Sequence, residues 1–343
     1  MLSRSPAPPG AGGKDLKMSV MESDRVPAAA DEPKASKSAR GGVRIRGNYV
    51  PYVLIAPAVV VLVGVLAYPL VDLFVLAFQN VNDYLHLSAP SLVKFIGFDG
   101  FTKVLSSAEF WQATERTVLF TLEVVTASIV LALLFGLLLQ RVSNWAKVTV
   151  VTSLMFVWAI PQIVTGTVFR WLFANTGGVV DYLLYRITGN TGWRTHDWFA
   201  DSNQGLYVVV ALAVLWGALP FLVIGLNAAL TQVPKELVEA SKLDGANGWQ
   251  TFRHVVLPVI KPFLVLCTAL SFIWDFQVFG QIWALRQNSP EEGYRVLGIY
   301  LYQQGLGSSH YSTSAVISIL MILLMLAVLI FYIRQVIKIG EQD

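Results

Sequence analysis

The 343-residue chain is poor in charge, histidine and cysteine. Charged residues make up 14% of it, where a soluble domain of ordinary composition carries about a quarter. Because an ionised side chain is costly in hydrocarbon, a surface that faces lipid explains this deficit. Four His and the single Cys267 leave no material for a zinc cluster or a disulfide within the chain, so we expect no metal site. The net charge of +3 indicates no nucleic-acid partner.

The chain also lacks a phosphate-binding loop of the form Gly-x-x-x-x-Gly-Lys-Ser/Thr. Gly13-Lys14 is followed by Asp15 and has no glycine at the required upstream position. The long apolar segments hold no cluster of His, carboxylate or Ser/Lys side chains, because only Glu123 and Asp275 are clear candidates. We therefore expect no catalytic residues, no cofactor bound by this chain and no ATP hydrolysis by it.

Two regions differ in composition. Residues 1–49 are rich in Pro, Ala, Gly, Ser and charge and show no apolar periodicity, which favours a disordered cytoplasmic tail. Residues 50–343 hold six segments with the roughly 20 apolar residues that a helix needs to cross a bilayer. These predicted spans are at about 50–78, 117–140, 148–169, 205–233, 262–285 and 312–333. The sequence therefore predicts an all-α integral membrane protein with six transmembrane helices.

Proline and charge refine this prediction. Pro57, Pro69, Pro161 and Pro220 lie inside the apolar segments and are expected to kink their helices. Six spans place both termini on one side. Arginine and lysine are more frequent in the segments that would then lie inside, above all in the tail, so the positive-inside rule favours cytoplasmic N- and C-termini. We expect a multi-pass membrane protein.

The polar stretch between the fourth and fifth segments, a loop at 234–258, is the most informative part of the chain. Pro234 suits the start of a helix, and residues 235–243 combine apolar Leu237, Val238 and Leu243 with polar residues as a short amphipathic helix does. Gly245 can adopt positive φ and end that helix. Such a helix, held by tight turns at the cytoplasmic end of a bundle, is a lever on which another protein can push.

The spacing within this loop carries a resemblance. Glu239-Ala240-Ser241, then Asp244-Gly245, then Val255-x-Leu257-Pro258 resembles the Glu-Ala-Ala…Gly…Ile-x-Leu-Pro coupling motif of binding-protein-dependent ABC importer permeases. Ser241 replaces the second Ala, and Val255 replaces Ile. Further similarity over most of residues 50–336, including 215–221, 170–184 and 300–315, resembles the maltose-type sugar-transporting branch.

The resemblance implies a type I ABC importer permease fold in a prokaryotic cell (cytoplasmic) membrane, and a set of partners. These are a second permease subunit, usually a different chain, two ATPase subunits that use ATP and Mg, and an extracytoplasmic sugar-binding protein. It implies that Glu239 makes a charge-assisted contact with the ATPase, that Ala240 packs closely and that Gly245 forms the turn. Ser241, Asp244, Leu257 and Pro258 complete the expected coupling set.

Polar and aromatic residues inside the membrane are candidates for the solute pathway. Asp275 interrupts the fifth segment among aromatic and amide side chains, and a charge at that depth usually faces a protein interior or an aqueous path. On helical spacing, Asp275 and Phe279 share a face, and Trp274 and Gln281 lie on the neighbouring one. The candidates are Trp274, Asp275, Phe276, Phe279, Gln281 and Glu123. A structural contact for Asp275 and packing or interfacial roles for the aromatics remain alternatives.

Other functions remain open at this point. A secondary transporter would show internal repeats and usually broken helices around an ion site, and no second copy of the loop motif is present. An importer for a phosphate ester or a peptide is a second alternative. The stretch 285–290 departs from the turn common in the maltose-type branch, in a loop that is a candidate contact for the binding protein. The fifth segment and the Tyr-rich approach to the sixth resemble permeases for chitobiose-type disaccharides.

Overall fold

The computed structural model describes residues 49–340, so the predicted tail at 1–49 lies almost wholly outside the described residues. The chain divides into two units, Met1–Pro57 and Ala58–Asp343. Within residues 49–340 the structure is helical, apart from one isolated bridge between Gln79 and Phe95. An all-α fold was predicted from the apolar segments, and this part of the chain agrees with it.

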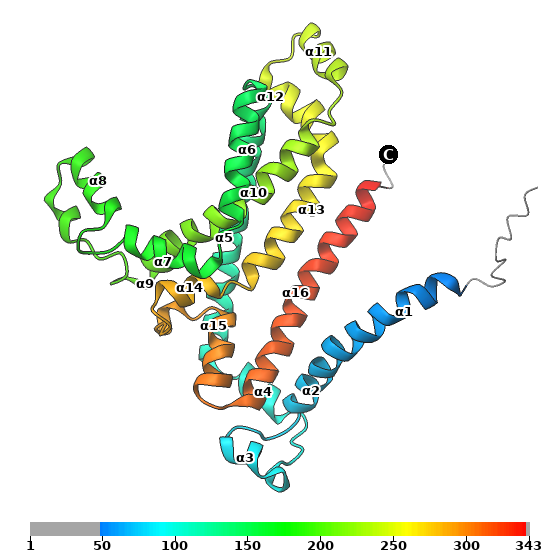
Figure 1. Cartoon of the computed structure of the whole chain (residues 1–343), viewed down its shortest axis with the longest axis vertical. Helices are drawn as coiled ribbons and strands as arrows, with labels where there is room; N and C mark the ends of the chain where they lie inside the picture. Colours follow the sequence, from blue (N-terminus) through cyan, green and yellow to red (C-terminus); the bar gives the residue numbers. More distant parts are fainter. Residues whose placement is uncertain (1–48, 341–343) are drawn as a thin grey trace, which may run out of the picture. The chain divides into compact units, whose positions relative to one another are not determined.

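Sixteen α-helices are labelled in chain order within the described residues, and most of them can be followed in Figure 1. They are α1 (Val50–Leu62), α2 (Tyr68–Ala77), α3 (Tyr84–Ser88), α4 (Asp99–Leu105), α5 (Ala108–Leu139), α6 (Asn144–Trp158), α7 (Gln162–Leu172), α8 (Val179–Thr188), α9 (Ser202–Gln204), α10 (Ala211–Leu230), α11 (Lys235–Leu243), α12 (Gly248–Thr251), α13 (Leu257–Phe276), α14 (Gly280–Leu285), α15 (Leu297–Tyr302) and α16 (Tyr311–Gly340).

Short π-helical stretches join some of these helices into longer ones. Gly205–Val210 joins α9 to α10, and Phe252–Val256 joins α12 to α13. Five helices of the described chain are then long and apolar enough to cross a membrane: Pro51–Ala77, Ala108–Leu139, Ser202–Leu230, Gly248–Phe276 and Tyr311–Gln335. A sixth span is present only if α6 and α7 are counted together as one broken span.

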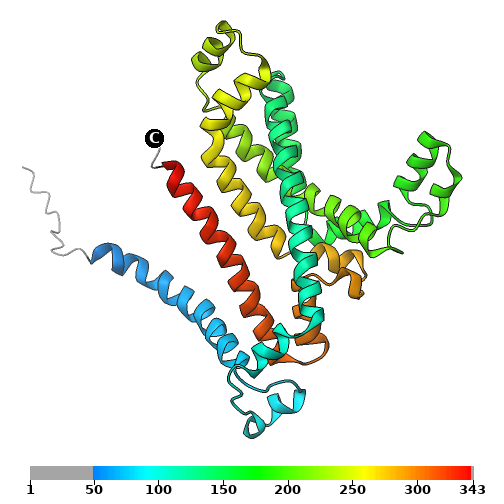
Figure 2. The same ribbon diagram turned by 180° about the vertical axis from the view of Figure 1, so that it is seen from behind.

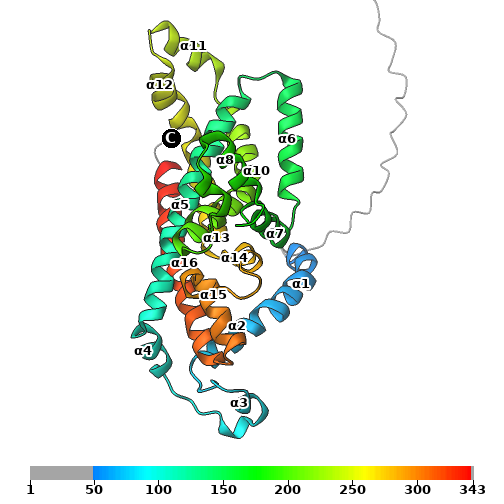
Figure 3. The ribbon, with the colours of Figure 1, turned by 90° about the vertical axis from the view of Figure 1, so that its left-hand side faces the viewer.

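The predicted third span at 148–169 is not one straight helix. α6 ends at Trp158, α7 begins at Gln162, and the two helices meet at 99°, a sharp bend that Figure 3 shows between them. Pro161 explains the break, because proline lacks an N–H donor and pushes the residue before it out of helical conformation. The predicted kink at Pro161 is confirmed, and the predicted continuity of the span is wrong.

The predicted fifth span at 262–285 also needs correction. The helix begins earlier, at Gly248, and ends at Phe276; Gln277 leaves helical geometry, and α14 is a separate short helix. Helical spacing does not continue past Phe276. The prediction that Asp275 and Phe279 share a helix face is therefore wrong.

In the unit Ala58–Asp343, α5 packs against both α10 and α13, and α13 packs against α16; Figure 2 shows these helices from behind. α5 and α10 approach closely at Gly136, where an added Cβ would lie 3.1 Å from the Leu230 side chain. One buried apolar cluster joins α5, α10 and α14 through Phe120, Val214 and Ile282. This packing brings the end of α13, the bend between α6 and α7, and α14 to the same part of the unit.

Candidate functional site

The helix α11 has a well-defined end. Gly245 has φ +83°, its N–H donates to the Lys242 carbonyl at 3.1 Å, and the Ala246 N–H donates to the Ser241 carbonyl at 3.0 Å. This pair of hydrogen bonds is a Schellman C-cap, which usually requires glycine at the left-handed position. The amphipathic helix predicted at 235–243 and its glycine stop are confirmed.

A second capped helix follows at once. The Asn247 and Gln250 side chains each accept a hydrogen bond from the other residue's backbone N–H, a capping box that starts α12. The hydroxyl oxygens of Ser241 and Thr251 lie 3.0 Å apart, and Thr251 is buried. The turn between α11 and α12 is therefore fixed by backbone caps on both sides and by one side-chain hydrogen bond.

Behind this turn, the chain continues without interruption into α13. Leu257 and Pro258 are the first two residues of α13, directly after the π-helical stretch Phe252–Val256, where the regular α-helical hydrogen-bond pattern is already interrupted. Leu257 and Val256 pack against a buried cluster that contains Ile260 of α13 and Leu230 of α10. A displacement of α11 would thus be passed to α13 and, through this apolar contact, to α10.

The other side of α11 is open. Glu236, Glu239, Ala240 and Leu243 are spaced at three and four residues, so they share a face, and all four are exposed. Leu243, at the end of this face, is 90% exposed. Val238 and Ser241 lie on the opposite, half-buried side. The exposed face of α11 is the face available for contact with another protein.

A cavity of about 400 Å³ lies where the breaks in the spans meet. Its size falls within the roughly 300–1,000 Å³ typical of small-molecule sites. The lining comes from the bend between α6 and α7, from α10, from the end of α13 and from α14: Trp158, Ile160, Gln162, Thr165, Ala213, Val214, Gly217, Ala218, Trp274, Asp275, Gln277, Val278 and Gln281. None of these lining residues is a lysine or an arginine.

Asp275 supplies the only charge in the lining of this cavity. Its side chain is 3% exposed, and Ser271, one helical turn earlier, donates a hydrogen bond to Asp275 Oδ2 at 2.8 Å. Gln281 is 6% exposed, and its carbonyl oxygen Oε1 has no hydrogen-bond partner among the described residues. A buried acceptor without a partner is costly unless a ligand or water binds it. The cavity is therefore equipped with acceptors for hydroxyl or amide N–H donors.

Aromatic rings form one side of the same cavity. Trp274 meets Phe221 edge to face with ring centroids 4.9 Å apart, and Trp158 stacks on Phe221 at 6.3 Å. Trp158 and Trp274 line the cavity, and Phe221 joins them from α10. Flat apolar faces beside hydrogen-bonding side chains suit a ligand that has both C–H surfaces and hydroxyl groups.

The predicted pathway residues separate into two groups. Trp274, Asp275 and Gln281 line the cavity together. Phe276 instead lies in a buried apolar cluster with α16, and Phe279 packs on Trp283 and Tyr302 beside a different, mostly apolar cavity. Glu123 is exposed on α5 and is not among the lining residues.

The prediction from sequence missed the contribution of the bend after α6. Gln162 and Thr165 of α7 line the cavity because α7 packs closely on α14. A Cβ added at Gly166 would lie 2.8 Å from the Ala284 Cβ, so only glycine permits this approach. Pro161 gave the signal for the bend, but nothing in the sequence indicated that the bend would face Asp275. In residues 49–340 no three His, Cys, Asp or Glu side chains gather as they would for a metal ion.

Comparison with known proteins gives consistent matches. The family described as "Binding-protein-dependent transport system inner membrane component" matches residues 128–338. The diacetylchitobiose uptake system permease protein DasB of Streptomyces coelicolor is 35% identical over 332 residues, covering 94% of this chain and 99% of that protein. The arabinooligosaccharides transport system permease protein AraP of Bacillus subtilis is 31% identical and covers 81% of this chain and 85% of its own.

A solved structure shares the fold. It is a chain of a bacterial ABC transporter involved in the import of the acidic polysaccharide alginate, with a TM-score of 0.72. The match covers 84% of this chain and 96% of the other, at 21% sequence identity. At that identity the likeness concerns the fold alone.

Proposed function

The chain belongs to the family of binding-protein-dependent transport system inner membrane components, and from this premise we propose that it conducts a neutral oligosaccharide into the cell. It is a non-enzymatic, multi-pass permease subunit of an ABC transporter in the bacterial cytoplasmic membrane, and the ATPase is a separate subunit. The family excludes a secondary transporter and a membrane-embedded enzyme. The solute, the coupling residues and the assembly are the subject of the proposal.

The cavity at Asp275 carries the proposal for the solute. A carboxylate, three glutamine side chains and two tryptophan rings line it without any cation. A phosphate ester or another anion would meet the negative charge of Asp275 with no compensating arginine or lysine, an arrangement that costs binding energy. Hydroxyl groups and C–H faces of a neutral sugar match these acceptors and rings. Relatives named for diacetylchitobiose and for arabinooligosaccharides agree with this class.

The α11 loop is the proposed contact with the ATPase. Glu239, on the exposed face, would pair with a basic ATPase residue, and Ala240 beside it would allow close packing. Ser241, Asp244 and Gly245 would hold the end of the helix. Leu257 and Pro258 would carry the displacement into α13, because Leu257 packs against the α10–α13 contact.

The assembly follows from the same premise. We propose two permease subunits, this chain and a different one, with two ATPase subunits that use ATP and Mg, and an extracytoplasmic sugar-binding protein. Six spans, counting α6 and α7 as one broken span, would put both termini and α11 on one side of the membrane, which we assign to the cytoplasm by the positive-inside rule. Residues 1–49 would be a cytoplasmic tail ahead of the permease domain at 50–343. Closure of the ATPase pair would then switch access to the Asp275 cavity from one side to the other.

Purification and transport together test this proposal. The tagged full-length chain is purified in mild detergent, and its partners are identified by mass spectrometry. The purified complex, reconstituted with its binding protein and ATP, is then assayed for uptake of radiolabelled diacetylchitobiose and arabinotriose. ATP-dependent uptake of either sugar supports the proposal. A complex that takes up sugar phosphates but neither neutral oligosaccharide would overturn it.

A further inference from the structure

A second polar site lies at the other end of the span that leads to α11. The helix Ser202–Leu230 has 29 residues, about 43 Å at 1.5 Å per residue. Its last residues precede α11, and its first residues pack against the loop that follows α14. In that loop Tyr294 is 2% exposed, and an added Cβ at Gly205 would lie 1.7 Å from the tyrosine hydroxyl oxygen. The loop is therefore fitted closely to the start of the span, on the membrane side opposite α11.

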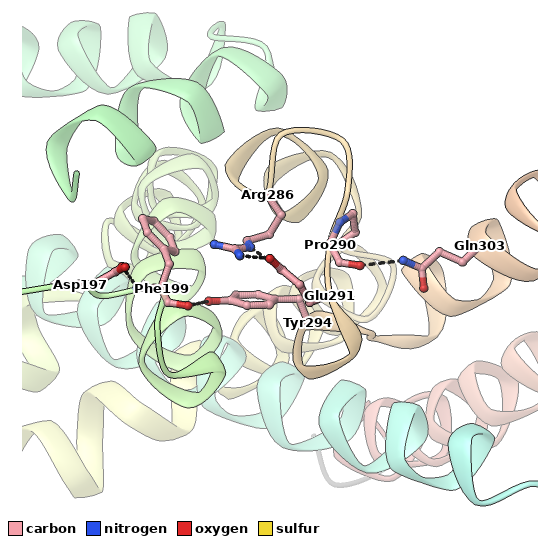
Figure 4. A network of polar contacts seen from close by, with 7 residues as sticks. All are labelled: Asp197, Phe199, Arg286, Pro290, Glu291, Tyr294 and Gln303. Atoms are coloured by element: carbon pink, nitrogen blue, oxygen red, sulfur yellow. Dashed lines mark hydrogen bonds and ion pairs between the residues drawn. The ribbon is translucent and has the colours of Figure 1, made fainter. Parts of the chain in front are cut away.

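Arg286 organises this loop. Its Nε donates to Glu291 Oε2 at 2.7 Å, and its Nη2 contacts the other carboxylate oxygen of Glu291. The guanidinium carbon lies 4.6 Å from the centre of the Tyr294 ring and 5.4 Å from that of Phe199, and Figure 4 shows the Arg286 side chain beside both residues. A bidentate ion pair held against two rings is a rigid arrangement. Glu291 engages two of the three guanidinium nitrogens, and the group has five N–H donors, so it can still donate to a ligand.

Other hydrogen bonds brace the same loop. Asp197 accepts a hydrogen bond from the Phe199 N–H at 2.9 Å. Gln303 of the next helical stretch donates to the Pro290 carbonyl at 2.8 Å, and both contacts are visible in Figure 4. These contacts fix the two walls of the site without using the Arg286 donors. The site is thus preformed, which lowers the cost of binding.

Between these walls is a pocket of about 440 Å³ that is separate from the Asp275 cavity. It is lined by Arg170, Ala174, Asn175, Asp197, Phe199, Leu285, Arg286, Gln287, Ser289 and Glu291. Two arginines and two carboxylates balance, so the lining carries no net charge. Amide, hydroxyl and guanidinium groups around one aromatic ring can donate to and accept from a ligand that is itself uncharged.

The backbone supports a role for this lining. Gln287 and the following Asn288 have φ of 53° and 63°, and two successive non-glycine residues in the left-handed region are strained. Strain of this kind persists only where the surroundings hold it, and it gathers at binding sites. Here it leaves Gln287 among the residues that line the pocket.

The short helix α14 relates the two sites. Gln281 lines the Asp275 cavity and Leu285 lines the outer pocket. Residues four apart on a helix are separated by about 6 Å along its axis. The two sites therefore lie about one helical turn apart along α14.

We propose that the outer pocket at Arg286 is a second saccharide-binding subsite, which receives a neutral oligosaccharide before it reaches the Asp275 cavity. Arg170, Arg286 and Gln287 donate to sugar oxygens, Asp197 and Glu291 accept from hydroxyl or acetamido groups, and Phe199 offers an apolar face. The inference rests on the proposed function for the solute class. It differs from contact with the binding protein, which would use the same loop as a protein-docking surface.

Site-directed labelling tests the subsite directly. Cys267 is the single cysteine of the chain and is buried, so Ser289→Cys introduces one exposed thiol in the pocket. The complete complex carrying this change is treated with a membrane-impermeant maleimide, alone or with diacetylchitobiose, arabinotriose or glucose 6-phosphate. We expect a neutral oligosaccharide to slow labelling several-fold and glucose 6-phosphate to leave it unchanged. Thr191→Cys, exposed outside the pocket, is the matched control and is expected to react equally in every case.

Further measurements distinguish a saccharide subsite from a docking surface for the binding protein. Labelling is repeated with the binding protein without sugar; protection by that protein alone would make the pocket a docking surface and overturn the subsite. Gln287→Cys provides a second probe if Ser289→Cys does not assemble. Arg170→Ala is expected to raise the KM for uptake several-fold, whereas Arg186→Ala, exposed on α8, should not. If the wild type takes up sugar but neither thiol is protected, only the subsite fails; if the wild type takes up no neutral sugar, the proposed function fails.

Discussion

The hydroxyl oxygen of Ser241 lies 3.0 Å from that of Thr251, across the turn that joins α11 to α12. The Ser241 hydroxyl also donates to the Val238 carbonyl at 2.9 Å. Because serine has one hydroxyl proton, this bond to Val238 leaves Thr251 as the donor between the two side chains. Ser241 stands where the family motif has alanine, so this chain has a side-chain link that an alanine could not make.

Loss of this link should loosen α11 from α12 and so from the helix that continues into α13. We expect Thr251→Val, which keeps the shape and removes the donor, to lower the solute moved per ATP hydrolysed. A hydrogen bond of about 1 kcal/mol corresponds to about a fivefold shift between docked and loosened α11. The measurement is the ratio of sugar uptake to ATP hydrolysis in proteoliposomes.

The double variant Ser241→Ala/Thr251→Val supplies the control for this prediction. If the two hydroxyls act on each other, the double variant should be no worse than Thr251→Val alone. Additive losses would show that each residue acts through some other contact.

The turn at Gly245 gives a second prediction. With φ of +83°, an L side chain there is strained by about 1–2 kcal/mol. We expect Gly245→Asp to reach the membrane in normal amounts but to uncouple ATP hydrolysis from uptake. Gly248→Ala is the matched control, since its φ is ordinary and its Cβ would meet open space.

Glu239→Lys, on the exposed face of α11, should uncouple in the same way through reversed charge. Normal uptake by both Gly245→Asp and Glu239→Lys would sink the coupling assignment.

The carboxylate of Asp275 is expected to act on solute rather than on folding. We expect Asp275→Asn to lower uptake about tenfold or more, because a lost hydrogen bond to a charged group is worth about 1.5–3 kcal/mol. ATP hydrolysis stimulated by loaded binding protein should persist. Ser271→Ala, which removes the hydrogen bond to Asp275 Oδ2 but keeps the carboxylate, should have a smaller effect. Equal loss of uptake and of stimulated ATP hydrolysis in Asp275→Asn would instead indicate a structural contact.

The structure agrees with the sequence pattern where neighbouring residues alone determine the backbone conformation. The helix at 235–243, its glycine stop and the kink at Pro161 follow from residue types at fixed spacing, and the structure has all three. The end of α13 at Phe276 does not follow from local pattern, because apolar residues continue to Leu285. Helical periodicity extended across that break placed Phe279 beside Asp275, although it packs on Trp283. Tertiary contacts of α14 determine the position of Phe279 after this break.

The same limit applies to the two pockets. Asp275 stood out as a lone charge in an apolar segment, but Gln162 and Thr165 joined it only through the close contact of α7 with α14 at Gly166. The residues that line the outer pocket come from three separate stretches of the chain, 170–175, 197–199 and 285–291. No single stretch of sequence contains its pattern, and only the departure at 285–290 marked the loop as unusual.

The close fit of Tyr294 to Gly205 gives a prediction about stability. An added Cβ at Gly205 would overlap the tyrosine hydroxyl, and overpacking of this kind costs about 1–3 kcal/mol. We expect Gly205→Ala to lower the melting temperature of the purified complex and to reduce its yield. Gly217→Ala is the control in the same helix, because its Cβ would meet nothing within 4 Å. Equal melting temperatures for the two variants would contradict the packing described for the loop.

The ion pair of Arg286 with Glu291 should give the outer loop a defined pH dependence. The hydrogen bond from Arg286 lowers the pKa of Glu291 below its ordinary value. A carboxylate with a lowered pKa in the folded state stabilises the fold above its unfolded pKa, about 4.3, and loses that contribution as pH falls through the folded value. The melting temperature of the wild type should therefore exceed that of Glu291→Gln by a constant amount from pH 8 to about pH 5 and converge with it in stronger acid. Glu292→Gln, which removes the neighbouring carboxylate, should leave the melting temperature close to that of the wild type throughout. Because Glu291 is 59% exposed, solvent screens the pair and the gap should be small; a gap that persists unchanged in strong acid would show that Glu291 acts through its shape and not through its charge.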